Sequence, residues 1–279
     1  MKNVRYIIPV LILAVLNSFM ACDKIDAPYK ETHNTGTDTT TYVQKVLIED
    51  FTGHRCGNCP RAHEKLHQLI TVYGDKVIGI ALHSGFFATP LPPNYPADFR
   101  TTEAEELATT FGVTQWPIGM VNRTAYNGSV LLSHDAWSEA VANLINQTPK
   151  AHIAIQANYQ TASSKVDASI TIKLLQSIEV PLKLCVYLTE DSIISAQTDY
   201  DMNPNLIPNY VHMHVFRASF NGTWGNELSL TGKQVGDTLL RQFNLTWNAA
   251  WVKKNSHVVA FIYNANDNTI IQAEQGSIQ

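Results

Sequence analysis

The sequence lacks several features that mark other classes of protein. It has no cluster of Lys and Arg and a formal net charge of −4, which argues against nucleic acid as a partner. No nucleotide, flavin or haem signature occurs, so we expect no bound cofactor. No internal repeat is evident, and the 16% of charged and 45% of hydrophobic residues are typical of a globular protein.

The N-terminus has the composition of an export signal. Lys2 and Arg5 form a basic start, residues 6–16 form an apolar core, and Ala21 and Cys22 close the segment. The apolar core is too short for a membrane helix, which needs roughly 20 apolar residues. We therefore expect a signal peptide at residues 1–21.

Cys22 suggests how the mature chain is held in the cell. Ordinary cleavage after Ala21 would put Phe19 three residues before the cut, where a small residue is expected. The segment instead resembles a bacterial lipoprotein signal, which implies that Cys22 is lipidated and anchors the chain to a membrane. The alternative is a plain signal peptide with an incidental thiol at Cys22. Residues 22–42 then form a lipidated Cys and a polar, flexible tether.

The remaining length suits two domains of ordinary size, and the periodicity changes near Pro149. We expect one domain at residues 43–149 and another at residues 150–279. Before Pro149, strands alternate with helices, which implies a central sheet covered by helices. The expected strands are 43–51, 76–83 and 119–123, and the expected helices are 59–73, 101–111 and 135–146.

After Pro149 nearly everything has the pattern of strands and turns. Seven short strands separated by turn signals predict an all-β antiparallel, Ig-like sandwich. The expected strands are 152–159, 165–175, 182–188, 210–219, 237–245, 257–263 and 269–274.

Cysteine is scarce, with four in 279 residues, yet two of them form the motif Cys56-Gly57-Asn58-Cys59. The motif follows an apolar strand and precedes a helical pattern in an exported chain, which favours a redox dithiol over a zinc ligand pair. The positive end of a helix favours thiolate over thiol, and His54 or Arg55 could lower the pKa of Cys56 further. Cys56 is therefore the candidate nucleophile and Cys59 the resolving thiol. An inert structural disulfide and a metal site remain alternatives.

The residues around the dithiol resemble those of thioredoxins. Asp50 stands six residues ahead of Cys56 at the end of an apolar strand, and Trp116-Pro117 precedes a later strand. The resemblance implies a thioredoxin-like α/β fold for the first half, with Asp50 helping to take the proton from Cys59. It also implies a cis peptide before Pro117 and pairing of the Trp116 backbone with a substrate strand.

An aromatic and Pro-rich loop lies between His83 and Thr101, and it includes Phe86 and Phe87. A loop between a strand and a helix at this point should stand near the dithiol. We interpret it as a surface for a substrate or partner, while a loop that packs only on itself is the alternative.

The mature chain resembles the twenty-eight-kilodalton outer-membrane protein family of bacterial lipoproteins, which joins a thioredoxin-like domain to a β-sandwich. The resemblance rests on residues 49–53 leading into 56–60, and on residues 210–217 with their His-x-His pattern. It implies a lipoprotein of the cell envelope, held at the outer membrane and facing the periplasm or the cell surface.

The histidines support a rival hypothesis in which the protein handles copper or zinc. His63 follows the dithiol on the expected helix, His83 ends the neighbouring strand, and His212 and His214 share one face of an expected strand. Cys185 lies in an apolar strand and is expected to be a buried small hydrophobe.

The sequence therefore predicts an exported, membrane-tethered thiol-disulfide oxidoreductase whose partners are proteins with dithiols or disulfides. A surface scaffold lipoprotein with a non-catalytic domain is the alternative from another class. The direction of the reaction depends on the relative stability of the dithiol and disulfide forms, which the motif alone does not set. The sequence carries no signal for an oligomeric state.

Overall fold

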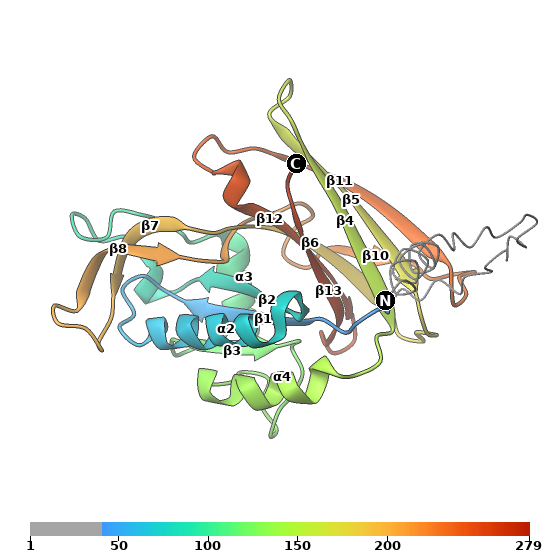
Figure 1. Ribbon diagram of the computed structural model, residues 1–279, viewed down its shortest axis with the longest axis horizontal. Helices are drawn as coiled ribbons and strands as arrows, with labels where there is room; N and C mark the ends of the chain where they lie inside the picture. The colour runs from blue at the N-terminus through green and yellow to red at the C-terminus, as the bar shows by residue number, and fades with distance from the viewer. Residues whose placement is uncertain (1–40) are drawn as a thin grey trace, which may run out of the picture. The chain divides into compact units, whose positions relative to one another are not determined.

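The computed structural model describes residues 41–279 (Figure 1). The expected signal peptide, Cys22 and the tether up to residue 40 lie outside the described residues. Within the described part, no helix is both long enough and apolar enough to cross a membrane.

The first half alternates strands and helices as its periodicity indicates. Its elements are β1 (Val46–Thr52), α2 (Cys59–Tyr73), β2 (Val77–His83), α3 (Thr102–Thr110), β3 (Ile118–Val121) and α4 (Trp137–Ile145), with short 3-10 turns at Gly74–Lys76, Phe86–Ala88 and His134–Ala136. Pro60 stands in the first turn of α2, where its missing N–H costs no helical hydrogen bond. The helix ends at Gly74, whose φ of +62° suits glycine.

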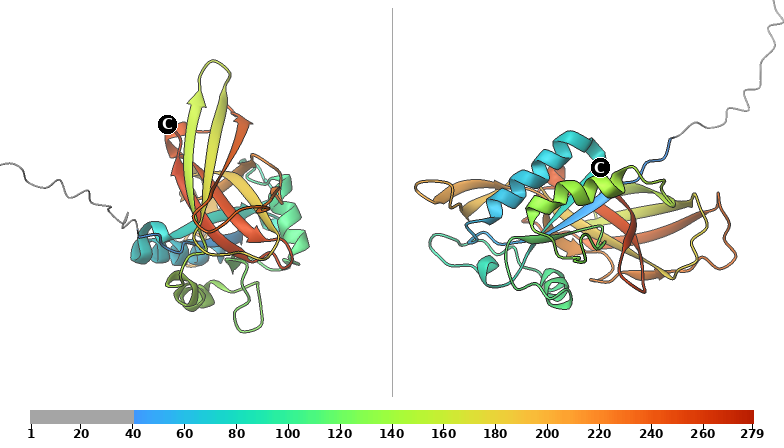
Figure 2. Two further views of the ribbon diagram at one scale, coloured as in Figure 1. Left: turned by 90° about the vertical axis from the view of Figure 1, so that its right-hand side faces the viewer. Right: turned by 90° about the horizontal axis from the view of Figure 1, so that it is seen from below.

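The helices cover both faces of the strands. Val46 and Ile48 of β1 pack in a core with residues of α2 and α4, whereas Leu47 and Phe51 pack with residues of α3. Successive side chains of a strand point to opposite faces, so α2 and α4 lie on one side and α3 on the other. The view from below in Figure 2 shows α2 and α4 together on one face.

The second half consists of strands. They are β4 (Ala151–Gln160), β5 (Lys165–Leu174), β6 (Leu182–Glu190), β7 (Ile193–Thr198), β8 (Leu206–His212), β9 (Val215–Ser219), β10 (Asn226–Leu228), β11 (Thr238–Thr246), β12 (Ser256–Asn264) and β13 (Ile270–Ser277), with a 3-10 turn at Lys253–Asn255. The strand expected at 210–219 is two strands, because His214 has a φ of +58° and breaks it.

The two halves share one sheet, so the predicted fold class is wrong. An eight-stranded sheet runs in the order β13-β12-β6-β9-β2-β1-β3, and β10 pairs with β6 beside this path. The junction is a parallel pairing of β2 with β9, where Ala81 faces Val215 and the Ala81 N–H donates to the His214 carbonyl at 2.8 Å. The chain is therefore not an α/β thioredoxin-like domain followed by an all-antiparallel sandwich.

The physical reason for this difference lies in the side chains along the junction. Every residue of β2 is buried, so its outer edge needs a covering strand, and β9 supplies it. Phe51 and Leu82 from the first half share one hydrophobic core with Tyr187, Phe216 and Phe261 from the second. The expected division at residues 149 and 150 falls between α4 and β4, and it stays a prediction.

Two smaller sheets complete the structure. The antiparallel sheet β11-β5-β4 packs through its apolar face on β6 and β12, and buried residues such as Ile170 and Val258 lie in that core. The β7–β8 hairpin is a separate two-stranded sheet, and it extends at the left of Figure 1 toward the loop that precedes α2.

Candidate functional site

Cys56 and Cys59 form a disulfide at the beginning of α2. The Cys56 N–H donates to the Gly53 carbonyl at 2.9 Å, which closes the turn between β1 and the helix. Only 2% of Cys56 is exposed, and Cys59 is fully buried. The sequence placed this pair correctly at a helix start, and the structure adds that both sulfur-bearing residues are covered.

Asp50 lies on β1, the strand on which the first turns of α2 pack. Its side chain is fully buried, and neither carboxylate oxygen has a hydrogen-bond donor among the described residues. Burial raises the pKa of Asp50 to about 8. A carboxyl group with this pKa can take up and release a proton near neutral pH, which is the property expected of a general base or acid.

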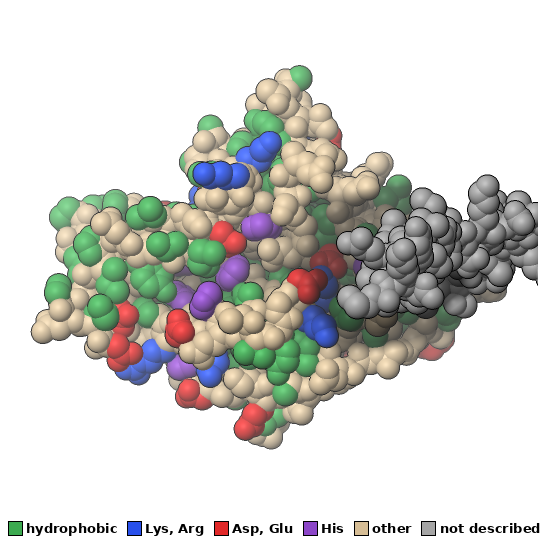
Figure 3. Space-filling model, in the orientation of Figure 1, with side chains coloured by type: hydrophobic (Ala, Val, Ile, Leu, Met, Phe, Trp, Pro, Cys, Tyr) green, Lys and Arg blue, Asp and Glu red, His purple; other side chains and the backbone are tan. Residues whose placement is uncertain are grey.

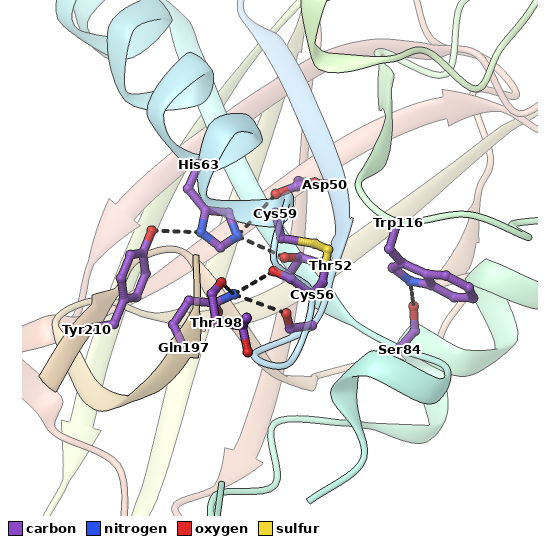
Figure 4. Close-up of a disulfide and its surroundings, with 11 residues drawn as sticks. Asp50, Thr52, Cys56, Cys59, His63, Ser84, Trp116, Gln197, Thr198 and Tyr210 are labelled. Atoms are coloured by element: carbon purple, nitrogen blue, oxygen red, sulfur yellow. Dashed lines mark hydrogen bonds and ion pairs between the residues drawn. A yellow bond between two sulfur atoms is a disulfide. The ribbon is translucent and has the colours of Figure 1, made fainter. Parts of the chain in front are cut away.

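His63 on α2 lies close to Asp50. Its Nε2 lies 2.8 Å from Thr52 Oγ1 and 3.7 Å from Asp50 Oδ2. Its Nδ1 shares a hydrogen bond of 2.8 Å with the Tyr210 hydroxyl. Figure 4 shows the imidazole between these partners, one helical turn beyond Cys59. Burial lowers the pKa of His63 to about 3, so the ring is uncharged at neutral pH.

The β7–β8 hairpin covers the turn that carries the dithiol. The Thr198 N–H donates to the His54 carbonyl and the Tyr200 N–H donates to the Gly57 carbonyl, both at 2.9 Å. Gln197 Nε2 donates to the Cys56 carbonyl at 2.9 Å (Figure 4). A segment about 140 residues away in sequence therefore binds the backbone on both sides of Cys56, in a manner resembling the addition of a strand.

Side chains strengthen this cover. The ring of Tyr200 lies so close to Gly57 that a Cβ at that position would be 2.4 Å from it. Arg61 on α2 forms two hydrogen bonds with the Asp201 carboxylate, at 2.7 and 2.6 Å. The sequence interpretation missed the hairpin, although Gly57 was a sign of close approach by another part of the chain.

Trp116 lies on the other side of the disulfide from Gln197 and Thr198 of the hairpin in Figure 4. The Trp116-Pro117 peptide bond is cis, so that prediction is confirmed. The half-buried Trp116 ring packs on Gly85, and its Nε1–H donates to Ser84 Oγ at 3.3 Å. Its expected role in binding a substrate chain stays a prediction.

The loop with Phe86 and Phe87 contacts the dithiol turn. The Arg55 N–H donates to the Phe87 carbonyl at 3.0 Å, and the Arg55 guanidinium lies over the Phe86 ring at 4.6 Å. Phe86 is 66% exposed, whereas Phe87 is partly buried against Trp116. The loop thus stands near the dithiol as expected, and its use as a partner surface stays a prediction.

His54 differs from the sequence interpretation. Burial lowers the pKa of its ring to about 4, so His54 is uncharged at neutral pH and does not supply the positive charge suggested for Cys56. The ring lies 6.5 Å from that of His83 and 6.0 Å from that of Phe99, in a buried aromatic group. Arg55 is the cation next to Cys56.

The candidate metal ligands do not converge on one point. His83 and His212 are buried side by side, with ring centres 5.7 Å apart, but His63 is held by Thr52 and Tyr210. His214 lies past the end of β8, where its Nδ1 is 3.2 Å from Asp191. Within residues 41–279, no three His, Cys, Asp or Glu side chains are arranged to hold a metal ion.

Cys185 lies in β6 and is fully buried as a free cysteine, as the sequence predicts. Burial raises the pKa of its thiol to about 12, which makes it unreactive at neutral pH.

A match to a family model shows the family to which the chain belongs. The model of the outer membrane protein Omp28 matches residues 104–279, more than half of the sequence. The chain belongs to the Omp28 family. Both the resemblance stated above and the location at the bacterial outer membrane are thereby confirmed. The match to Omp28 begins after Cys59, so the dithiol lies outside it.

A solved structure shares this architecture. HBP35 of Porphyromonas gingivalis has a TM-score of 0.63 at 18% identity, and the match covers 85% of this chain and 76% of HBP35. A domain of the outer membrane lipoprotein Omp28 from Porphyromonas gingivalis has a TM-score of 0.33 at 20% identity, over 48% of this chain and 91% of the domain. The likeness to HBP35 shows a shared fold that includes both halves. No curated protein matches the chain.

Proposed function

We propose that this member of the Omp28 family is a thiol-disulfide oxidoreductase that acts through Cys56 and Cys59. The observation that carries the proposal is the placement of the disulfide at the start of α2, beside a strand that holds the buried Asp50, whose carboxylate has no hydrogen-bond donor among the described residues. A structural staple closing so short a loop would stabilise the fold little, and it would have no use for a carboxyl group with a pKa near 8.

The reaction in the reducing direction has two steps. The Cys56 thiolate, favoured by the N-terminal end of α2, attacks a partner's disulfide and forms a mixed disulfide, while the partner's first sulfur leaves as a thiolate. Cys59 then passes its proton to Asp50 in the fraction of molecules whose Asp50 carboxyl group is ionised, and the Cys59 sulfur attacks Cys56. The partner's second sulfur leaves with the electron pair, so two electrons pass to the partner and the Cys56–Cys59 disulfide remains.

Access to Cys56 requires a movement near the site. Because Cys56 is 2% exposed, a partner's sulfur reaches it only when the β7–β8 hairpin or the loop at Phe86 and Phe87 shifts. The exposed ring of Phe86, together with Trp116, then offers an apolar surface beside the dithiol. The electrons come from, or pass to, another protein with a dithiol, and the protein itself needs no cofactor.

The decisive experiment measures the reduction potential of the dithiol in residues 23–279, by titration in glutathione buffers, and the rate of Cys56 alkylation against pH. We expect a reversible potential between roughly −120 and −270 mV and a Cys56 pKa below about 7.5. Cys56→Ser is the control for the titration, and the buried Cys185 is an internal control for alkylation. A Cys56 pKa near about 8.5 with no reversible exchange would instead favour the scaffold function.

The proposal includes an anchor at Cys22, which would keep the dithiol at the outer membrane. Replacement of Cys22 by Ala should release the chain from the membrane fraction without changing the redox potential. Mass spectrometry of the mature wild-type chain should show the added acyl chains on its first residue, and an unmodified Cys22 would contradict the anchor.

A further inference from the structure

Asp50 has no direct contact with solvent, although its proposed role requires a proton to enter and leave in every turnover. Its carboxyl group is fully buried and accepts no hydrogen bond from the described residues. A proton that arrives from Cys59 would therefore remain on Asp50 unless a neighbouring group carries it away. His63 is in a position to do so, because its Nε2 lies 3.7 Å from Asp50 Oδ2.

His63 is placed by the geometry of α2. It stands four residues after Cys59, so both side chains lie on the same face of the helix, toward β1. On that strand Thr52 Oγ1 is 2.8 Å and Asp50 Oδ2 is 3.7 Å from His63 Nε2. An approach of less than 1 Å would bring the carboxyl group and Nε2 within hydrogen-bonding distance.

The other ring nitrogen of His63 faces outward. Nδ1 shares a 2.8 Å hydrogen bond with the hydroxyl of Tyr210, which comes from β8 of the hairpin. His63 and Tyr210 line a cavity of about 890 Å³, whose wall also includes the exposed pair Arg61 and Asp201. The His63 side chain is 18% exposed, so it joins the buried carboxyl group to water.

We propose that His63 relays protons between Asp50 and this cavity, and that Thr52 and Tyr210 hold its ring in the orientation that the relay needs. The inference rests on the proposed oxidoreductase function. In the tautomer with hydrogen on Nδ1, Nε2 accepts a hydrogen bond from the Thr52 hydroxyl; when the Asp50 carboxyl group approaches, the Nε2 lone pair exchanges Thr52 for Asp50 and takes the proton that came from Cys59. The Nδ1 hydrogen then passes toward Tyr210 and the water of the cavity, and His63 returns to its neutral form. Burial favours this neutral form, because it lowers the pKa of the ring.

The relay is tested by separating the two sulfur reactions. Reduced protein is mixed with 5,5′-dithiobis(2-nitrobenzoate): attack by Cys56 releases one nitrothiobenzoate anion, and attack by Cys59 on the resulting mixed disulfide releases a second. In His63→Gln we expect the first release to be unchanged and the second to be about tenfold slower at pH 7, less than the roughly 100-fold or greater loss typical when the acid or base itself is removed. Above about pH 9, where Cys59 ionises without help, the difference should disappear.

Further variants distinguish a relay from a merely structural role. In His63→Ala, added imidazole should restore the second release, and Tyr210→Phe, which lacks only the hydroxyl, should slow it about threefold because the ring loses one hydrogen bond. His67→Gln, at the exposed position one turn further along α2, is the matched control and should behave as the wild type.

Two failures are distinguishable. If the wild type releases no second anion, the oxidoreductase function is wrong and the relay with it. If the wild type does, but His63→Gln matches it or is slowed equally at all pH values without rescue by imidazole, the relay alone is overturned.

Discussion

The ionisable side chains around the dithiol are governed by burial more than by pairing. Burial raises the pKa of Asp50 to about 8 and lowers that of His63 to about 3 and that of His54 to about 4. All three groups are therefore mainly uncharged at pH 7. The region beneath the disulfide is therefore kept free of fixed charge.

Asp50 makes the stability of the protein depend on pH. The carboxyl group ionises near 3.8 when unfolded and near 8 when folded, so the folded state loses stability as the pH rises through this interval. The shift of about 4 units corresponds to about 5 kcal/mol. Asn does not ionise, so Asp50→Asn lacks this loss of stability. The free energy of unfolding of the variant minus that of the wild type should therefore increase by up to about 5 kcal/mol from pH 4 to pH 9.

Urea denaturation of both oxidised proteins at several pH values measures this difference. Asp167→Asn is a suitable control, since Asp167 is an exposed residue of β5 and its replacement should leave the pH dependence almost unchanged. A difference between Asp50→Asn and the wild type that is the same at pH 4 and pH 9 would show that the Asp50 carboxyl group is not the buried acid described here.

Individual elements follow from the sequence where the pattern of apolar residues is regular. Helix α2 has the predicted bounds, Cys59–Tyr73, because the dithiol, Pro60 and the apolar positions at helical spacing agree. Strand β7 was not predicted, because its pattern is inverted: the apolar Ile194 is exposed, while Gln197 is fully buried under the dithiol turn. The polar end of β7 binds backbone groups of the dithiol turn, and the sequence pattern of β7 alone does not indicate this contact.

The candidate site was likewise predictable only where its residues lie close together in the sequence. Cys56, Cys59 and Asp50 lie within one strand-turn-helix segment, so spacing along the chain was enough to bring them together. Tyr210 reaches His63 from 147 residues away, and the pairing of β2 with β9 joins Ala81 and Val215, which are 134 residues apart. Contacts of this kind depend on how the sheet closes, which is a property of the whole chain.

The β7–β8 hairpin should limit access to the dithiol. Gln197 holds it to the Cys56 carbonyl, and the net loss of one hydrogen bond is about 1 kcal/mol, or about fivefold in an opening equilibrium. In the reduced protein, we expect Gln197→Ala to raise the rate of Cys56 alkylation by iodoacetamide about fivefold. Ile194→Ala is the matched control, because Ile194 is exposed on the same hairpin. Equal rates in Gln197→Ala and the wild type would mean that the hairpin does not control access.

The hairpin also differs from the rest of the surface in composition. Its exposed side chains include several large hydrophobic ones, and Figure 3 shows hydrophobic side chains gathered at the β7–β8 end of the molecule. They are Ile194, Tyr200, Met202 and Val211, followed by Met213 just beyond β8. The β7–β8 hairpin covers the dithiol and also carries these apolar side chains. A movement of the hairpin would therefore change the apolar surface next to the dithiol.

At the scale of the whole molecule, a buried ion pair lies where the two halves meet. Arg123, which follows β3, donates two hydrogen bonds to the Glu49 carboxylate on β1, at 2.7 and 2.6 Å. The guanidinium also lies 5.3 Å from the ring centre of Phe111 and 5.2 Å from that of Phe261 on β12. Both charged side chains are almost fully buried, so each depends on the other for compensation of its charge.

Removal of one partner should therefore destabilise the whole shared sheet. In Glu49→Gln the buried guanidinium loses its counter-charge, and we expect the free energy of unfolding to fall by about 3–5 kcal/mol. The double variant Glu49→Leu with Arg123→Met removes both charges and should recover most of this loss. Urea unfolding followed by tryptophan fluorescence and by far-UV circular dichroism measures both effects. Because strands of both halves form one sheet, the two signals should change together in each variant, and separate transitions in the wild type would contradict a single cooperative structure.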